Sequence, residues 1–130
     1  MGGDNDKQSV GKLGESLVAR YLEGRGWQII GRNIREKFGE IDILAKAADG
    51  MLHFVEVKTI SRGYAEYSGM SPEDNLSRKK LLKMKKIADW YANSRPELIG
   101  VAGWQIDLAA VRMDEEGSGG DEIKFYGNVS

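Results

Sequence analysis

Two runs of β-forming residues, separated by a strong turn signal, constrain the fold of this chain more than any other feature. The runs Ile41 to Ala45 and Leu52 to Thr59 flank residues 46–50, which end in Asp49-Gly50, a pair typical of tight β-turns. A turn centred near Asp49 sets Asp42 directly opposite Glu56. The sequence therefore predicts a β-hairpin on which two acidic side chains face each other.

The predicted hairpin also brings an ammonium group to the same face. Glu56 and Lys58 are two residues apart in an extended strand and point the same way, whereas Val55 and Val57 point to the opposite, apolar face. Two carboxylates roughly 5 Å apart disfavour each other's ionisation unless a cation is present. Mg²⁺ or Mn²⁺ would supply that cation, because such ions take one or two carboxylates together with water and phosphate oxygens. We expect metal ligation by Asp42 and Glu56, with Lys58 orienting a water or stabilising phosphoryl charge.

The local pattern also has a plainer interpretation. Acid-x-Lys triplets are common in a chain with 30% charged residues, and Glu122-Ile123-Lys124 is a second copy. A surface ion pair between Glu56 and Lys58 has the same local sequence and contributes only about 0 to 1 kcal/mol. The metal site is favoured because charged groups inside apolar strands are costly unless they are paired or used.

Several ordered motifs together resemble the YraN family of small bacterial proteins. The matching residues are Gly14-Glu15, Arg32-Asn33, Gly39-Glu40-Ile41-Asp42, Phe54-Val55-Glu56-Val57-Lys58 and Lys80. The resemblance runs from about Val10 to about Asn128, and the family is itself similar to archaeal Holliday junction resolvases and other PD-(D/E)XK, restriction-endonuclease-like proteins. It implies a metal-dependent nuclease in which Asp42, Glu56 and Lys58 occupy the motif positions and Glu15 is the acidic residue of the first helix.

Two positions depart from the family pattern. Thr59 follows the motif lysine where a basic residue is common, and the chain ends in Gly127-Asn128-Val129-Ser130 rather than in an apolar terminus. Neither departure touches the expected metal ligands. They bear on the substrate contacts and on the last strand.

Composition bounds the domain organisation and the class of partner. A chain of 130 residues buries roughly two-thirds of the surface that it exposes when unfolded, so we expect one domain, residues 1–130, with a disordered polar tail at 1–8. The chain contains no cysteine and shows no apolar stretch typical of a signal peptide or membrane span, which favours a cytoplasmic protein. Its net charge of −1 provides no general attraction for nucleic acid, so any such contact needs a local basic patch.

The order of expected elements is α, β, β, β, α, β, β, which suits a mixed sheet flanked by helices, as in restriction-endonuclease-like proteins. Helices are expected from Ser9 to about Arg25 and from Ser71 to about Ser94, and the remaining strands at 27–34, 101–113 and 122–128. The expected apolar stripe of the first helix is Val10, Leu13, Leu17 and Tyr21, widened by Val18 and Leu22. Asp107 is a candidate extra carboxylate, although a polar residue on the outer face of its strand is the favoured interpretation.

Basic residues concentrate in the second expected helix, between Arg78 and Lys86. A run of this kind is often only a solvated helix face, but an acidic metal site repels phosphate and needs cations nearby. The candidate nucleic-acid contacts are Lys79, Lys80, Lys83, Arg32, Arg35 and Arg62.

The sequence as a whole favours a Mg²⁺- or Mn²⁺-dependent endonuclease that hydrolyses phosphodiester bonds in branched or otherwise structured DNA. In it Asp42 and Glu56 are metal ligands, Glu15 is an accessory ligand and Lys58 is the activator. Two alternatives remain: a nucleic-acid-binding module of the same fold that does not cut, and an α/β protein whose motif is a surface ion pair. The resemblance to resolvases also implies a homodimer, for which Trp90, Trp104 and Phe125 are apolar candidates.

Overall fold

The computed structural model describes residues 3–61, 76–113 and 121–129, whose strands form one five-stranded mixed sheet in the order β1-β2-β3-β4-β5. The strands are β1 (Gln28–Glu36), β2 (Gly39–Lys46), β3 (Leu52–Ser61), β4 (Trp104–Met113) and β5 (Glu122–Tyr126). Neighbouring strands are antiparallel except for β3 and β4, which are parallel. A parallel pair needs a crossover connection, and helix α3 (Arg78–Ser94) lies on that crossover.

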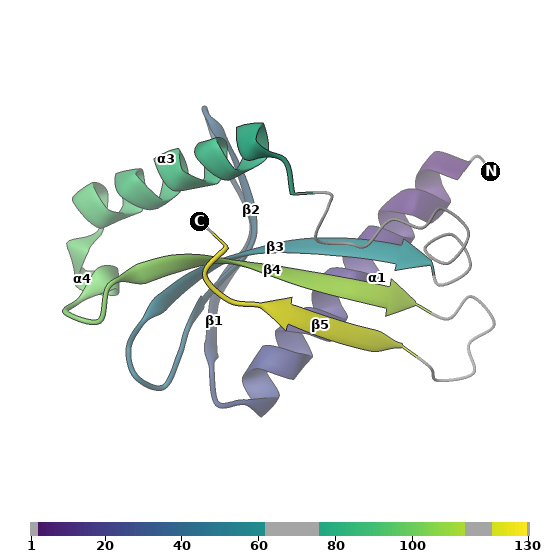
Figure 1. Cartoon of the computed structure of the whole chain (residues 1–130), viewed down its shortest axis with the longest axis horizontal. Helices are drawn as coiled ribbons and strands as arrows, with labels where there is room; N and C mark the ends of the chain where they lie inside the picture. The colour runs from purple at the N-terminus through teal and green to yellow at the C-terminus, as the bar shows by residue number, and fades with distance from the viewer. Residues whose placement is uncertain (1–2, 62–75, 114–120, 130) are drawn as a thin grey trace.

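The two long helices cover opposite faces of the sheet (Figure 1). On one face, α1 (Gly3–Gly24) packs Val18 and Leu22 against Ile43, Val55 and Val111. On the other, α3 packs Met84, Ile87, Ala88 and Tyr91 against a cluster that includes Phe54 and Ile106. The expected αβββαββ order and helix-flanked mixed sheet are confirmed, with one added short helix, α4 (Pro96–Ile99).

Both long helices begin at places that differ from the expected ones. The backbone of α1 is helical from Gly3 rather than from Ser9, so most of the expected tail is part of the helix. Helix α3 begins at Arg78, after Ser77 in an extended conformation whose side chain accepts a hydrogen bond from Lys80 N at 3.1 Å. One continuous helix from Ser71 is therefore wrong, and Ser71 itself lies outside the described residues.

The buried face of α1 also differs from the expected stripe. Gly14, Val18 and Leu22 are buried, whereas Leu13 is 50% exposed and Tyr21 37% exposed. A side chain at position 14 would overlap Thr59 Oγ1 on β3. The helix therefore contacts β3 at Gly14. With Gly14 facing the sheet, Leu13 and Tyr21 are directed away from it.

The sequence favoured a position for Asp107 on the outer face of its strand. That prediction is wrong, because Asp107 lies in the middle of the sheet. It is fully buried, and its carboxylate lies 2.6 Å from His53 Nδ1. The same carboxylate accepts hydrogen bonds from Gln105 Nε2 at 2.7 Å and from Asn128 N at 2.8 Å. Because β4 is flanked by β3 and β5 and covered on both faces, a polar side chain in it must find partners inside the protein.

The segment after β5 returns across β4 toward α3 (Figure 1). Val129 N donates to Ile106 O at 2.8 Å, and the Val129 side chain packs on the α3 side of the sheet. Val129, in the terminal segment that departs from the family pattern, thus packs on the core.

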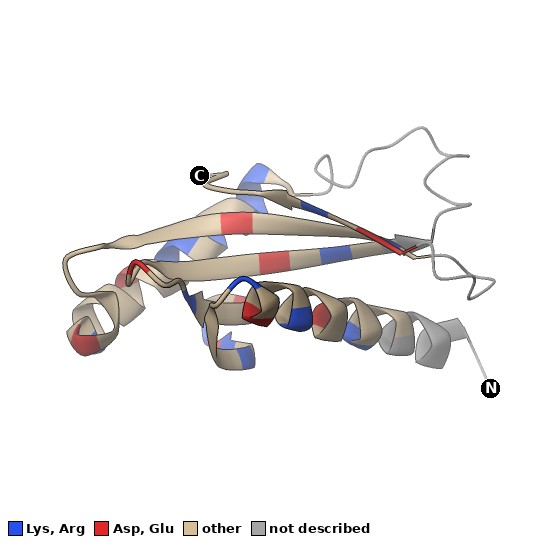
Figure 2. Cartoon of the chain, turned by 90° about the horizontal axis from the view of Figure 1, so that it is seen from below, with Lys and Arg blue, Asp and Glu red and all other residues tan. Residues whose placement is uncertain are grey.

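Charged residues are sparse along the middle strands and frequent on the helices (Figure 2). No helix within the described residues is long and apolar enough to cross a membrane. Of the three apolar candidates for a dimer contact, Trp90 is 40% exposed. Trp104 and Phe125 are half-buried and contact the rings of Phe54 and Trp27.

Candidate metal centre

The hairpin of β2 and β3 has the predicted register. Lys46 pairs with Leu52 and Ile43 with Val55, and the turn between the strands is closed by Gly50 at a φ of 91° and by a hydrogen bond from Met51 N to Asp49 Oδ1 at 3.0 Å. The described pairing ends at Ile43 and Val55, one step before Asp42 and Glu56. The two acidic residues therefore stand where the strands begin to separate.

Asp42 lies beside a residue of unusual backbone conformation in β1 and just beyond the last residue of β2 that is paired with β3. On the β1 side the pairing passes from Arg32 with Ile43 to Ile34 with Ile41, and between them Asn33 has a φ of 53°, a left-handed conformation that asparagine tolerates better than most residues. On the β3 side, Asp42 Oδ2 accepts a hydrogen bond from Val57 N at 2.8 Å. The side chain of Asp42 thus bonds to the backbone of β3 beyond the last paired residues.

Glu56 is the most buried acid of this group, with 3% of its surface exposed. Burial, followed by the neighbouring Asp42 carboxyl, raises the pKa of Glu56 to about 8, against the opposing effect of Lys80. Lys80 Nζ lies 2.7 Å from Glu56 Oε2. One ammonium from α3 therefore partly compensates two neighbouring carboxyl groups on the hairpin.

Glu15 approaches Asp42 from the α1 side of the sheet. Burial and then Asp42 raise the pKa of Glu15, and Arg32 acts in the opposite direction. Arg32 Nη2 lies 3.7 Å from Glu15 Oε1, and that oxygen is buried with no hydrogen-bond partner among the described residues. The contact between Gly14 and Thr59 holds this part of the helix close to β3.

These residues fit a divalent cation held by few protein ligands. Within residues 3–61, 76–113 and 121–129, no three His, Cys, Asp or Glu side chains converge as a ready-made metal cluster. Two carboxylates are nevertheless enough for Mg²⁺, which usually keeps several waters and shares phosphate oxygens of a substrate. The pKa of Glu56 stays raised although Lys80 lies beside it, and burial with Asp42 also raises the pKa of Glu15 although Arg32 lies beside it, so the nearby cations do not fully compensate these carboxyl groups.

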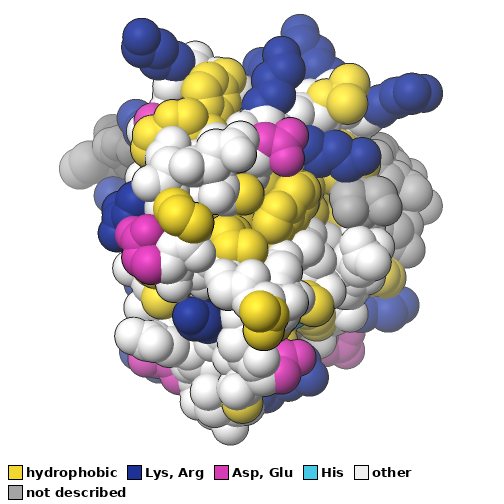
Figure 3. All heavy atoms as spheres, turned by 90° about the vertical axis from the view of Figure 1, so that its left-hand side faces the viewer, with side chains coloured by type: hydrophobic (Ala, Val, Ile, Leu, Met, Phe, Trp, Pro, Cys, Tyr) yellow, Lys and Arg dark blue, Asp and Glu magenta, His cyan; other side chains and the backbone are white. Residues whose placement is uncertain are grey.

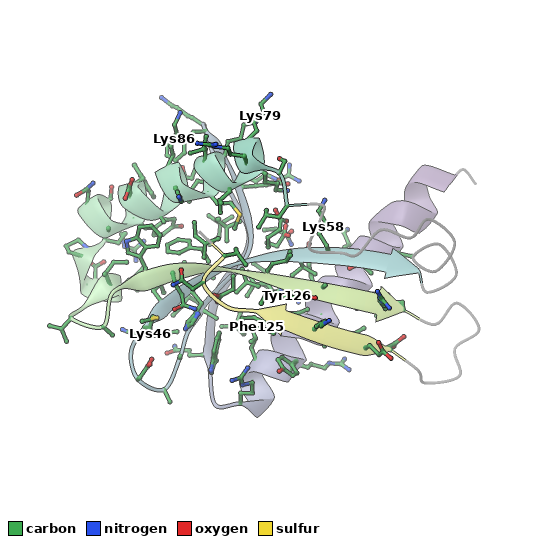
Figure 4. All side chains as sticks on the ribbon, in the orientation of Figure 1. Lys46, Lys58, Lys79, Lys86, Phe125 and Tyr126 are labelled. Carbon is green, nitrogen blue, oxygen red and sulfur yellow. The ribbon has the colours of Figure 1, made fainter. Side chains whose placement is uncertain are left out.

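The expected activator, Lys58, is half-buried on β3. It extends on the side of the sheet where α3 lies (Figure 4), and no ion pair involves it among the described residues. Val55 and Val57 pack on the apolar face of β3 that α1 covers, as predicted. Glu56 and Lys58 alternate with them and lie on the opposite face.

The candidate nucleic-acid contacts fall into three groups. Four of them, Lys79, Lys80, Lys83 and Arg35, border a hollow of about 670 Å³ between the β1–β2 turn and α3. Arg35 also lies 3.6 Å from Glu40. Arg32 instead contacts α1, donating to Ser16 Oγ at 3.2 Å. Arg62 lies outside the described residues.

Sequence reasoning missed the contact of Lys80 with Glu56. A signal for it was present, because Lys80 continues the buried row Met84, Ile87 and Tyr91 toward the start of α3 at helical spacing. A lysine in line with core residues is directed toward the sheet, unlike its solvated neighbours.

Comparisons with known proteins find relatives over most of the chain. A UPF0102 protein of Campylobacter jejuni is 36% identical over 121 residues, 92% of each chain, and one of Corynebacterium efficiens is 38% identical over 90 residues, 69% of this chain and 70% of the relative. Among solved structures, Pyrococcus furiosus SfsA in complex with Ca²⁺ is similar with a TM-score of 0.41 and 21% identity, over 93% of this chain and 63% of that one. The family model described as uncharacterised protein family UPF0102 matches residues 14–113. The chain therefore belongs to the UPF0102 family, the YraN family that its motifs resemble.

Proposed function

We propose that this protein is a Mg²⁺- or Mn²⁺-dependent endonuclease that hydrolyses phosphodiester bonds in branched or otherwise structured DNA. The observation that carries the proposal is a pair of neighbouring carboxyl groups, the partly buried Asp42 and the buried Glu56, with the ammonium of Lys80 at Glu56. Buried acids of like charge are costly to keep, and perturbed acids of this kind concentrate at functional sites. The phosphodiester of a nucleic acid is the substrate class that such a site suits.

Each side chain has a distinct task in this proposal. Asp42 and Glu56 hold the metal, and Glu15 holds one of its waters. When bound, the metal polarises the phosphoryl oxygens and lowers the pKa of a water. Lys58, two residues beyond Glu56 on the same strand face, donates hydrogen bonds to the charge that develops on the phosphoryl group.

The second candidate is a nucleic-acid-binding module of the same fold that does not cut. One observation favours it: Lys80 already supplies a cation to Glu56 at 2.7 Å, so the hairpin is partly neutralised without a metal. The two candidates differ in whether a divalent ion displaces this contact.

The test is a cleavage assay on linear, flapped and four-way DNA, with and without Mn²⁺, for the unchanged protein and for Lys58→Ala. Loss of one transition-state stabiliser lowers a rate by about 10² to 10³, so we expect cleavage to fall by that factor while Mn²⁺ and DNA binding persist. Lys124→Ala is the matched control, because Lys124 is the lysine of the second acid-x-Lys triplet and lies on β5. Metal-independent DNA binding without cleavage of any substrate supports the second candidate, and normal cleavage by Lys58→Ala removes Lys58 from the mechanism.

A further inference from the structure

A groove lies beside the candidate metal centre, between the turn that joins β1 to β2 and the first half of α3. It has a volume of about 670 Å³. Sites of about 300 to 1,000 Å³ enclose ligands of small-molecule size. The groove therefore suits a segment of about one or two nucleotides. It is too small to enclose a double helix.

The groove is strongly cationic although the chain is not. Five basic side chains border it against two acidic ones, Glu36 and Glu40, while the whole chain carries a net charge of −1. The basic residues are Arg35, Lys37, Lys79, Lys80 and Lys83. Lys and Arg side chains also crowd the upper part of the molecule in Figure 3, over α3 and the β1–β2 turn.

One aromatic residue lies among these cations. Phe38, at the β1–β2 turn, lines the groove, and the part of it that is buried packs on the α3 side of the sheet. Gly39 follows it at a φ of 150°, and a side chain there would come within 3.4 Å of Lys83 Cβ. The turn is thus held against α3, and Phe38 shares the groove lining with lysines of the turn and of α3.

The groove is continuous with the candidate metal centre through Lys80. Its side chain lines the groove and its Nζ lies 2.7 Å from Glu56 Oε2. A phosphate chain that follows the lysines of α3 is therefore led toward the two carboxyl groups.

We propose that this groove binds single-stranded nucleic acid, with a base stacked on Phe38 and the adjoining phosphates held by Lys37, Lys79 and Lys83. Aromatic faces and cationic grooves together are the usual means of binding unpaired strands. Resting on the proposed function, the inference adds that the substrate carries an unpaired segment, such as a flap or an open branch. A continuous duplex lies across the outside of the groove and binds more weakly.

The test measures binding of a labelled oligothymidylate and of a blunt duplex of equal length by fluorescence anisotropy, with EDTA present so that cleavage plays no part. We expect the single strand to bind more tightly. Phe38→Leu should weaken it about fivefold to tenfold, as expected when the stacking of one base is lost. Lys79→Gln/Lys83→Gln should lower the slope of log affinity against log salt by about 1.4, since each single-strand phosphate contact contributes about 0.7.

The matched control is Lys85→Gln/Lys86→Gln, which removes the same charge from the same helix at positions that do not line the groove. It should change single-strand affinity less than twofold. The inference is overturned if both pairs weaken binding equally, if the duplex binds as tightly as the single strand, or if oligoglutamate competes as well as unlabelled oligothymidylate. Single-strand binding without cleavage contradicts only the nuclease proposal, whereas metal-dependent cleavage without single-strand binding contradicts only the groove.

Discussion

The charge balance around Glu56 is decided by three side chains. Glu56 is buried, Asp42 adds a second carboxyl group beside it, and Lys80 provides one ammonium at 2.7 Å. Burial and the like charge exceed the effect of the lysine, because the pKa of Glu56 remains raised. At neutral pH and without metal, this carboxyl group therefore retains a proton for much of the time.

This raised pKa predicts how stability depends on pH. An acid whose pKa is higher in the folded state than its ordinary 4.5 stabilises the fold fully below pH 4.5, and this contribution is lost as the pH rises toward about 8. Without metal, the contribution of Glu56 to the free energy of unfolding should therefore fall between those pH values. Urea unfolding across this range measures the effect, and Glu56→Gln should flatten the profile. A Glu56→Gln profile parallel to that of the unchanged protein would contradict it.

Substitution of Lys80 tests whether its ammonium occupies the place of a metal. Lys80→Met keeps an unbranched side chain but removes the cation, so the carboxyl groups of Asp42 and Glu56 should bind Mn²⁺ about tenfold or more tightly, given the usual strength of a hydrogen bond to a charged group. Calorimetric titration with Mn²⁺ measures this. Lys79→Met, at the exposed neighbouring position, should leave the affinity unchanged, and weaker Mn²⁺ binding by Lys80→Met would show that the lysine supports the metal site instead.

At the scale of whole elements, the site depends on how closely α1 approaches β3. Gly14 is buried against Thr59, and the next residue, Glu15, is directed toward Asp42. An alanine at position 14 would overlap Thr59 Oγ1. Gly14 thus makes the contact between α1 and β3, and this contact places Glu15 near Asp42.

Gly14→Ala should therefore destabilise the fold by about 1 to 3 kcal/mol, the usual cost of forcing an extra methyl group into a packed interior. Combining it with Thr59→Ala, which removes the overlapping hydroxyl group, should recover part of the loss. Urea unfolding measures both effects. The control is Gly11→Ala on the same helix, where no atom lies within 4 Å of the added carbon and alanine favours the helix. Equal losses for Gly11→Ala and Gly14→Ala would mean that close packing on Thr59 is not the cause.

The sequence could predict elements wherever the pattern was local. The register of β2 with β3 followed from the turn at Asp49-Gly50, and the mixed sheet followed from the order of the elements. The face of α1 was not predictable in this way, because Leu13 and Tyr21 complete an apolar stripe but the contact that decides the rotation is made by a glycine. Helix propensity and the spacing of apolar residues do not indicate which strand a glycine such as Gly14 will contact.

At the scale of the whole molecule, acidic residues of the strands fall into two polar regions with different partners. The acidic group of Asp42 and Glu56 lies where β2 leaves β3, beside charged residues of both helices. Asp107 lies within the covered middle of β4, where its described hydrogen-bond partners are His53, Gln105 and Asn128. From sequence alone, both regions are acidic residues in apolar strands. The pairing of the strands distinguishes them, because the described pairing of β2 with β3 ends before Asp42 and Glu56, whereas Asp107 is paired with Val55 of β3.

The final prediction follows from this division. Asp107→Ala removes the acceptor that the buried His53 ring shares with the partly buried groups of Gln105 and Asn128. We therefore expect a loss of about 3 to 5 kcal/mol in the free energy of unfolding, as when one partner of a buried pair is removed. Asp89→Ala, an exposed position on α3, should change stability by less than about 0.5 kcal/mol. Mn²⁺ affinity of the folded Asp107→Ala protein should equal that of the unchanged protein, because the described hydrogen bonds of Asp107 go to His53, Gln105 and Asn128 and not to Asp42 or Glu56. A variant that folds with normal stability but no longer binds Mn²⁺ would place Asp107 in the metal site and contradict its role as the acceptor that joins β3, β4 and the end of the chain.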